Sequence, residues 1–91
     1  MYRIIDGRGT GKTSRLMLLA KENNGVIVCA NPVKMREKAE VYGIVGLEFL
    51  SYKDFMEQPS DPSTPYYIDE LESYVKTLTQ GKLQGYTLSE E

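Results

Sequence analysis

The chain has 91 residues, 41% of them hydrophobic, and a net charge of −2. This length provides one small domain, and the weak negative charge gives no general attraction to nucleic acid or to an anionic membrane. Histidine is absent, which excludes the commonest general base and metal ligand. A single cysteine, Cys29, excludes an intrachain disulfide, and no signal peptide or long apolar stretch is recognisable. A cytoplasmic protein is expected.

The chain begins with an apolar run, Tyr2–Ile5, that predicts a short strand. A glycine-rich segment, residues 6–13, follows it, and a helix is expected over Lys12–Glu22. Strand, glycine-rich turn, Lys-Thr and helix form the layout of a phosphate-binding loop. The glycines let the backbone fold tightly around a phosphate, and the amides at the start of the helix point at the anion.

In this loop, Lys12 is expected to contact the β- and γ-phosphates, and the Thr13 hydroxyl is expected to bind Mg²⁺. The pattern usually begins with glycine, whereas Asp6 stands at that position here. Its side chain either changes the entry turn or places a negative charge that weakens phosphate binding. A purely structural glycine-rich turn is the alternative. The residues expected to bind the nucleotide are Gly7, Arg8, Gly9, Thr10, Gly11, Lys12, Thr13 and Ser14.

A strand and a second helix are expected next. The first helix should end at residues 23–25 (Asn-Asn-Gly), because asparagine and glycine readily take the left-handed conformation. The β-branched run Val26–Ala30 predicts a strand buried on both faces, with Cys29 as a core residue and not a nucleophile. Asn31 and Pro32 are then suited to the cap and the first turn of a helix.

The second helix has an apolar and a charged face. Met35, Ala39 and Tyr42 recur at helical spacing and are expected to face the core. Arg36 and Glu40 are expected to pair on the outer face, four residues apart. The alternative for Arg36 is to serve a neighbouring copy as a trans-acting arginine.

Residues 46–65 predict a strand, a short helix and a loop. Gly46–Ser51 predicts the strand, and Tyr52–Met56 predicts a short helical turn with Ser51 as its cap. Residues 58–65 contain three prolines, which rule out a helix there. The chain has seven tyrosines and two phenylalanines. Tyrosines either stack on a nucleotide base or, as we favour, fill a small core with their hydroxyls at its rim.

A second motif follows the loop. Tyr66–Ile68 predicts a strand, and it is followed at once by Asp69 and Glu70. This resembles the Walker B pattern of the P-loop NTPases, in which the aspartate holds Mg²⁺ and a following glutamate polarises the attacking water. By that resemblance Asp69 is the metal partner and Glu70 the general base. Alternatively, the two acids cap a helix that begins near Leu71.

Together the two motifs resemble the P-loop NTPases that carry a glutamate after the Walker B aspartate, as helicases, RecA-like and AAA proteins do. Residues 7–13 also resemble the ATPase motor of phage terminase large subunits, which suggests a phage or bacterial context. The resemblance covers residues 4–13 and 66–70. It implies ATP or another nucleoside triphosphate and Mg²⁺ as ligands. The implied catalytic residues are Glu70, Lys12 and Arg8, and the implied metal ligands are Thr13 and Asp69.

The chain is small for this family, whose motor domains are usually about twice its length or more. A minimal version, a fragment, or a subunit completed by a protein partner or by homo-oligomerisation is therefore expected. On the resemblance, Arg8 contacts the γ-phosphate of its own site or reaches a neighbour as an arginine finger. The alternative for Arg8 is a solvated loop charge.

The remaining residues complete the expected fold. Apolar residues at helical spacing predict a fourth helix: Leu71, Tyr74, Val75 and Leu78. Residues 82–91 predict a tail or a short edge strand. We expect one P-loop nucleotide-binding domain over residues 1–91, an α/β fold of three layers (α/β/α) with a mostly parallel sheet of four to five strands. The motif residues should converge at the carboxyl edge of that sheet.

The sequence leaves several functions open. The first is Mg²⁺-dependent binding and slow hydrolysis of ATP or another nucleoside triphosphate, alone or with a partner. The second is a non-catalytic nucleotide-binding regulator that acts on host or phage machinery. The third is an accessory part of a helicase or DNA-packaging motor, although the acidic charge argues against autonomous binding of nucleic acid.

Overall fold

The computed structural model describes residues 3–5, 9, 11–59 and 61–89. These residues form three strands and four helices, and the strands form one parallel sheet in the order β2-β1-β3. The elements are α1 (Lys12–Glu22), β1 (Val26–Cys29), α2 (Pro32–Val41), β2 (Glu48–Ser51), α3 (Tyr52–Glu57), β3 (Tyr66–Ile68) and α4 (Leu71–Leu78). The predicted α/β class is confirmed, with three strands in the described part of the chain instead of four to five.

The strand predicted over Tyr2–Ile5 is not part of the sheet within the described residues. Residues 3–5 lie outside the sheet, and Tyr2 is outside the described residues. A strand of a parallel sheet needs cover on both faces. Arg3 is exposed, however, and 75% of Ile5 is accessible to solvent. The guanidinium of Arg3 instead donates a hydrogen bond of 2.8 Å to the carbonyl of Ser89.

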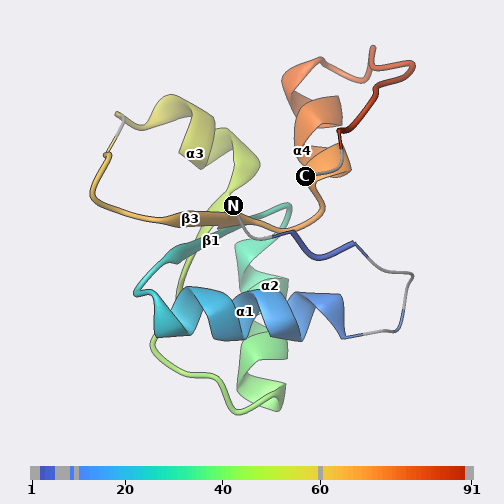
Figure 1. The fold of residues 1–91 in the computed structure, drawn as a ribbon. Helices are drawn as coiled ribbons and strands as arrows, with labels where there is room; N and C mark the ends of the chain where they lie inside the picture. Colours follow the sequence, from blue (N-terminus) through green and yellow to red (C-terminus); the bar gives the residue numbers. More distant parts are fainter. Residues whose placement is uncertain (1–2, 6–8, 10, 60, 90–91) are drawn as a thin grey trace.

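Helices lie on both faces of the sheet. In Figure 1, α1 and α2 cover one face, and α3 and α4 lie on the other. Ile27 and Cys29 alternate along β1 and join the buried cluster on the α1/α2 face, together with Met17 and Met35. Because β1 is the central strand, all four of its residues are buried, as predicted, whereas Ala30, the last residue of the predicted strand, follows β1 and is exposed.

The connection from α1 to β1 depends on a close approach. The helix ends where predicted, with Asn24 in the left-handed region at φ 54°. The amide of Gly25 then donates a hydrogen bond of 2.8 Å to the carbonyl of Ala20. A Cβ atom at Gly25 would lie 2.5 Å from the Tyr67 ring and 2.9 Å from the Pro65 carbonyl oxygen, so only glycine fits between β3 and the end of α1.

The core face of α2 is shorter than predicted. Met35 and Ala39 are buried as expected, but Tyr42 is 48% exposed, so its predicted core position is wrong. The chain turns at Gly43, with φ 74°, and the amide of Ile44 donates to the carbonyl of Ala39 at 2.8 Å. This turn folds Ile44 into the core in place of Tyr42, as hydrophobic residues after a glycine cap commonly do.

Two predicted helix caps are confirmed. The side chain of Asn31 accepts a hydrogen bond of 3.2 Å from the Lys34 amide at the start of α2. The hydroxyl of Ser51 accepts one of 3.1 Å from the Asp54 amide at the start of α3. Both bonds satisfy amides that have no partner within their helices.

Arg36 makes an aromatic contact instead of the predicted pair with Glu40. Its guanidinium carbon lies 5.8 Å from the centre of the Phe49 ring, on β2. This cation–π contact keeps the arginine of α2 against the sheet.

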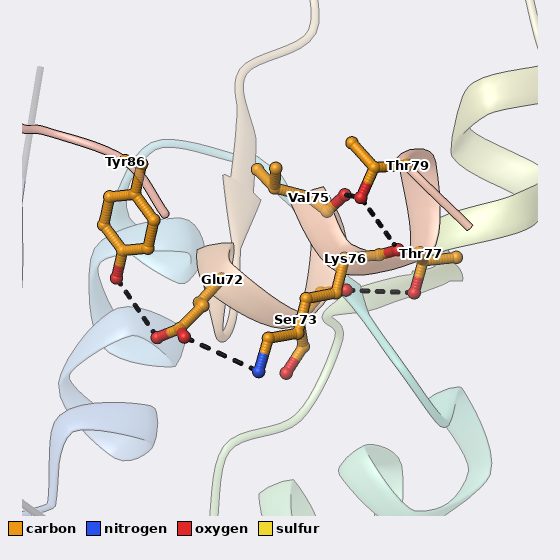
Figure 2. A network of polar contacts seen from close by, with 7 residues as sticks. All are labelled: Glu72, Ser73, Val75, Lys76, Thr77, Thr79 and Tyr86. Atoms are coloured by element: carbon orange, nitrogen blue, oxygen red, sulfur yellow. Dashed lines mark hydrogen bonds and ion pairs between the residues drawn. The ribbon is translucent and has the colours of Figure 1, made fainter. Parts of the chain in front are cut away.

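The last helix and the residues after it lie at the surface. Helix α4 forms as predicted, but Leu71 and Leu78 of its apolar stripe are each more than half exposed. Within 82–89 the chain forms neither helix nor strand. Figure 2 shows how this segment returns to α4. The Tyr86 hydroxyl donates a hydrogen bond of 3.2 Å to the Glu72 carboxylate, which also forms an ion pair with Lys76 at 3.6 Å. Within the described ranges, no helix has the length and apolarity needed to cross a bilayer.

Candidate functional site

The carboxyl edge of the sheet offers a place where chain segments diverge. The chain leaves β1 toward α2 on one face and leaves β3 toward α4 on the other (Figure 1). In open α/β sheets, ligands bind in the crevice that such divergence creates. Asp69 and Glu70 directly follow β3, and the Asp69 amide donates a hydrogen bond of 2.9 Å to the carbonyl of Val28. That bond extends the ladder by one residue and fixes Asp69 at this edge.

The amino terminus of α1 arrives at the same edge. Gly11 precedes it in the left-handed conformation, at φ 77°, which a residue with a side chain adopts only with strain. The Ser14 hydroxyl donates a hydrogen bond of 2.9 Å back to the carbonyl of Gly11 and closes the first turn. Lys12 and Thr13 therefore stand at a helix start, where backbone amides without helical partners favour an anion.

Two side-chain contacts join α1 to the residues after β3. The Thr13 hydroxyl donates a hydrogen bond of 3.2 Å to Oδ1 of Asp69. The Nζ atom of Lys12 lies 3.4 Å from Oε1 of Glu70, with the two side chains 24% and 50% exposed. The expected convergence of these four residues is confirmed. Their chemical roles stay predictions.

Two further residues of the predicted loop are described, Gly9 and Ser14. Gly9 is exposed and has a φ of 79°, and the Ser14 hydroxyl faces its own helix. The other loop positions of the prediction, Asp6, Gly7, Arg8 and Thr10, lie outside the described residues.

The backbone at Glu70 is strained. Its φ and ψ are 57° and 68°, a left-handed conformation that costs a residue with a side chain about 1–3 kcal/mol. Glu70 occupies the cap position of α4, yet its side chain makes no capping hydrogen bond. The alternative that this acid serves to cap the helix therefore lacks its defining contact. Its carboxylate turns toward Lys12 instead.

Tyr52 belongs to the site, although the sequence predicted only base stacking or, as favoured, a position in the core with its hydroxyl at the rim. It is 5% exposed, and its hydroxyl donates hydrogen bonds to the carbonyl oxygens of Asp69, at 2.7 Å, and Glu70, at 3.3 Å. Burial, and then the charge of Asp69, raises the pKa of Tyr52 to about 12, so the hydroxyl remains a donor at neutral pH. Because the ring is buried, base stacking by Tyr52 is excluded. Its carbonyl partners are distant in sequence and leave no local pattern.

Opposing effects act on the pKa of Asp69. Burial raises the pKa of this carboxyl, and the neighbouring Glu70 charge adds to the rise. The hydrogen bond from Thr13 lowers the pKa, as do the positive charges of Lys38 and Lys12. Lys38, on α2, is a second cation near the site that the sequence did not single out. Asp69 is partly buried, and a bound cation would favour its ionised form.

Cys29 lies at the end of β1 and is buried, as predicted. Burial, followed by the Asp69 charge, raises the pKa of its thiol to about 11. The thiol is therefore protonated at neutral pH and unsuited to act as a nucleophile.

The donor set suits one kind of metal. Across the described residues, no three or more histidine, cysteine, aspartate or glutamate side chains gather in one place. The hydroxyl of Thr13 and the carboxylate of Asp69 provide two hard oxygens side by side. Mg²⁺ is commonly held by one or two protein oxygens, with water and substrate phosphates as its other ligands, so these residues fit that ion.

Comparison with protein-family models, curated proteins and solved structures finds no match to this chain.

Proposed function

We propose that this chain binds a nucleoside triphosphate, with ATP as the first candidate, together with Mg²⁺, and hydrolyses it slowly as a small P-loop-type NTPase. One observation carries the proposal: Thr13 contacts Asp69, a residue 56 positions away, at 3.2 Å, while the adjacent Lys12 contacts the adjacent Glu70 at 3.4 Å. A helix start with a lysine and a hydroxyl, facing two acids at a sheet edge, is suited to binding a phosphate and a hard metal ion.

The start of α1 is the proposed phosphate-binding site. The left-handed Gly11 directs the chain into the helix, and Lys12 supplies a positive charge beside the first-turn amides, which have no acceptor within the helix. Lys12 now has Glu70 as its anionic partner. An incoming phosphate takes the place of Glu70 at the Lys12 ammonium, because it carries more charge and also accepts hydrogen bonds from the helix amides.

Thr13 and Asp69 are the proposed metal ligands. When bound there, Mg²⁺ would neutralise charge on the phosphate oxygens. Asp69 must be ionised for that purpose, and the Thr13 hydroxyl helps to keep it so by lowering its pKa.

Glu70 is the proposed general base. Once a phosphate has replaced it at Lys12, its carboxylate is free to accept a proton from the water that attacks the terminal phosphorus. The bond from that phosphorus to the bridging oxygen breaks, and the nucleoside diphosphate leaves. The left-handed backbone at Glu70 supports this role, since strained conformations cluster at functional sites.

A second candidate function is nucleotide binding without hydrolysis. The observation that favours it is the same Lys12–Glu70 ion pair, because it engages both the phosphate-binding group and the proposed base. If the pair persists in the complex, the Glu70 carboxylate stays engaged with Lys12 and does not act as a general base. The chain would then act as a nucleotide-dependent regulator, and turnover distinguishes the two functions.

Calorimetry tests the proposal. ATP, ADP and GTP are titrated into the full chain with and without Mg²⁺, using Lys12→Ala and the matched control Lys76→Ala. Lys76 also pairs with a glutamate, at 3.6 Å, but on the exposed face of α4. We expect Mg²⁺-dependent triphosphate binding that weakens at least about tenfold in Lys12→Ala and is unchanged in Lys76→Ala. Absence of binding at millimolar nucleotide, or equal binding by both variants, contradicts the proposal.

A further inference from the structure

We infer that Tyr52 is a positioning residue that holds the Asp69–Glu70 turn in the geometry required for metal binding and turnover. This inference rests on the proposed function for its kinetic consequences. Its structural part concerns the turn itself and is tested without nucleotide.

The hydroxyl of Tyr52 is placed to fix two successive peptide groups. It donates to the carbonyl of Asp69 at 2.7 Å and to the carbonyl of Glu70 at 3.3 Å. The residue between these carbonyls, Glu70, has the left-handed backbone. A strained residue persists only where its surroundings over-determine it. The shared donor of Tyr52, on α3, helps to meet that requirement, and Lys12, on α1, contacts the Glu70 carboxylate.

The ring of Tyr52 has a separate task. It lies edge to face against the Tyr74 ring of α4, with ring centres 5.5 Å apart. The Tyr74 ring also packs against the Phe55 ring of α3, with ring centres 6.1 Å apart. These rings hold α3 against α4 on the sheet face that Figure 1 shows above β3. Since α4 begins immediately after Glu70, the ring fixes the helix and the hydroxyl fixes the turn that leads into it. Removal of the hydroxyl alone separates the two tasks.

The position of the hydroxyl predicts which function depends on it. Its two acceptors belong to the metal partner and the proposed base, on the β3 side of the site. The phosphate-binding side, with Gly11 and Lys12, belongs to α1. Loss of the hydroxyl should therefore weaken the effect of Mg²⁺ and slow turnover, and it should leave the affinity for metal-free nucleotide unchanged.

The test compares Tyr52→Phe with Tyr66→Phe. Tyr66 also loses one hydroxyl hydrogen bond, a 2.9 Å contact from the Gln58 side chain, but it lies at the amino end of β3, away from the site. Amide hydrogen exchange of the nucleotide-free proteins is the first readout. We expect faster exchange at the amides of Asp69 and Tyr74, which donate to the carbonyls of Val28 and Glu70 on either side of the turn. The increase should be about three- to tenfold, the range that one hydrogen bond provides, and should occur in Tyr52→Phe alone.

The second readout is nucleotide affinity with and without Mg²⁺, together with kcat. In Tyr52→Phe we expect the gain in affinity from Mg²⁺ and the kcat to fall about three- to tenfold, with metal-free affinity as in the wild type. A p-aminophenylalanine at this position, which restores an N–H donor, should recover both quantities. If the wild type binds no nucleotide, the proposed function fails, whereas faster exchange in Tyr52→Phe still supports the positioning role.

Equal exchange in the two phenylalanine variants overturns the inference. So does a fall in metal-free affinity as large as the fall in the Mg²⁺ effect, because it would show a general loss of structure. A Tyr52→Phe protein that fails to fold overturns it too, since the hydroxyl would then support the whole core.

Discussion

Thr13 donates its hydroxyl to the carboxylate of Asp69 across 3.2 Å, and this bond connects the start of α1 to the residue after β3. The bond lowers the pKa of Asp69, but burial outweighs it, so that the pKa of this carboxyl stays above its ordinary value of 3.8. Ionisation of the Asp69 carboxyl therefore carries a desolvation cost. That cost should be visible in stability and should be relieved by a cation.

Replacement of Asp69 by asparagine should stabilise the protein at neutral pH. Because the folded-state pKa is raised, the folded protein favours the protonated carboxyl. Stability from this group is fully present below pH 3.8 and is lost as the pH rises through the folded-state pKa. Asparagine still accepts the bond from Thr13 but carries no charge. In thermal unfolding, the advantage of Asp69→Asn over the wild type should grow as the pH rises from 3.8 toward neutrality.

Asp61 provides a control of opposite sign. Hydrogen bonds from Thr64 and Ser63 lower the pKa of Asp61 in its exposed turn. Its stabilising effect is present above pH 3.8 and is lost as the pH falls through the lowered pKa. Asp61→Asn should therefore lose stability at neutral pH, where Asp69→Asn gains it. The same trend in both variants would refute the desolvation account. Asp69→Asn should also abolish the effect of Mg²⁺ on nucleotide affinity.

Glu70→Gln should retain nucleotide binding and lose turnover. An amide cannot accept the proton of the attacking water, and loss of a general base lowers kcat by roughly 10²–10⁴-fold. Binding should remain or improve slightly, because Lys12 no longer has a charged competitor for the phosphate. The measurement is phosphate release under saturating ATP, alongside calorimetric affinity.

Glu72→Gln is the matched control for that experiment. Glu72 lies in the first turn of α4, is half exposed, and pairs with Lys76 at 3.6 Å (Figure 2). We expect wild-type turnover in this variant. Turnover in Glu70→Gln equal to that of Glu72→Gln would eliminate Glu70 as the base.

The main elements could be predicted because their signals are local. The Asn-Asn-Gly stop after α1, the Asn31 cap and the continuous β-branched run of β1 each act through neighbours within about one helical turn. The two acids after β3 could be assigned to the sheet edge because parallel strands all end there.

What the sequence could not provide depends on distant partners. The exposure of Ile5 and Tyr42 follows from which surfaces the rest of the chain covers, and no apolar pattern reports that. The contact of Tyr52 with the Asp69–Glu70 turn joins α3 to β3 through backbone carbonyls, which have no side-chain signature. The left-handed conformation of Glu70 contradicts local propensity altogether.

Gly25→Ala should destabilise the protein by about 1–3 kcal/mol, the usual cost of an overpacked position. The added Cβ would meet the Tyr67 ring at 2.5 Å and the Pro65 carbonyl oxygen at 2.9 Å. Relief of this clash moves β3 away from β1, since Val26 donates to the same carbonyl at 3.0 Å. Gly85→Ala is the control, because a Cβ there meets nothing within 4 Å. Denaturant unfolding of the two variants checks the difference, and equal stability would contradict the close approach.

Glycine at position 70 should be better for stability than alanine, although neither should support turnover. The two variants both lack the carboxylate and differ only in a Cβ atom, which the left-handed backbone at φ 57° disfavours. That penalty is about 1–2 kcal/mol, and the greater freedom of unfolded glycine returns about 0.5–1 kcal/mol. We expect Glu70→Gly to be more stable than Glu70→Ala by about 1 kcal/mol in chemical denaturation.

Gln80 supplies the same comparison far from the site. Gln80 has φ 56° just after the end of α4. Gln80→Gly should therefore be more stable than Gln80→Ala by a similar margin, and both variants should keep wild-type turnover. The two pairs together separate backbone strain from catalysis. If Glu70→Ala is as stable as Glu70→Gly while the Gln80 pair differs, the strain at Glu70 depends on its carboxylate and the ion pair with Lys12. If both pairs differ equally, the strain belongs to the turn, and the protein retains a glutamate there at a cost in stability that its chemistry must justify.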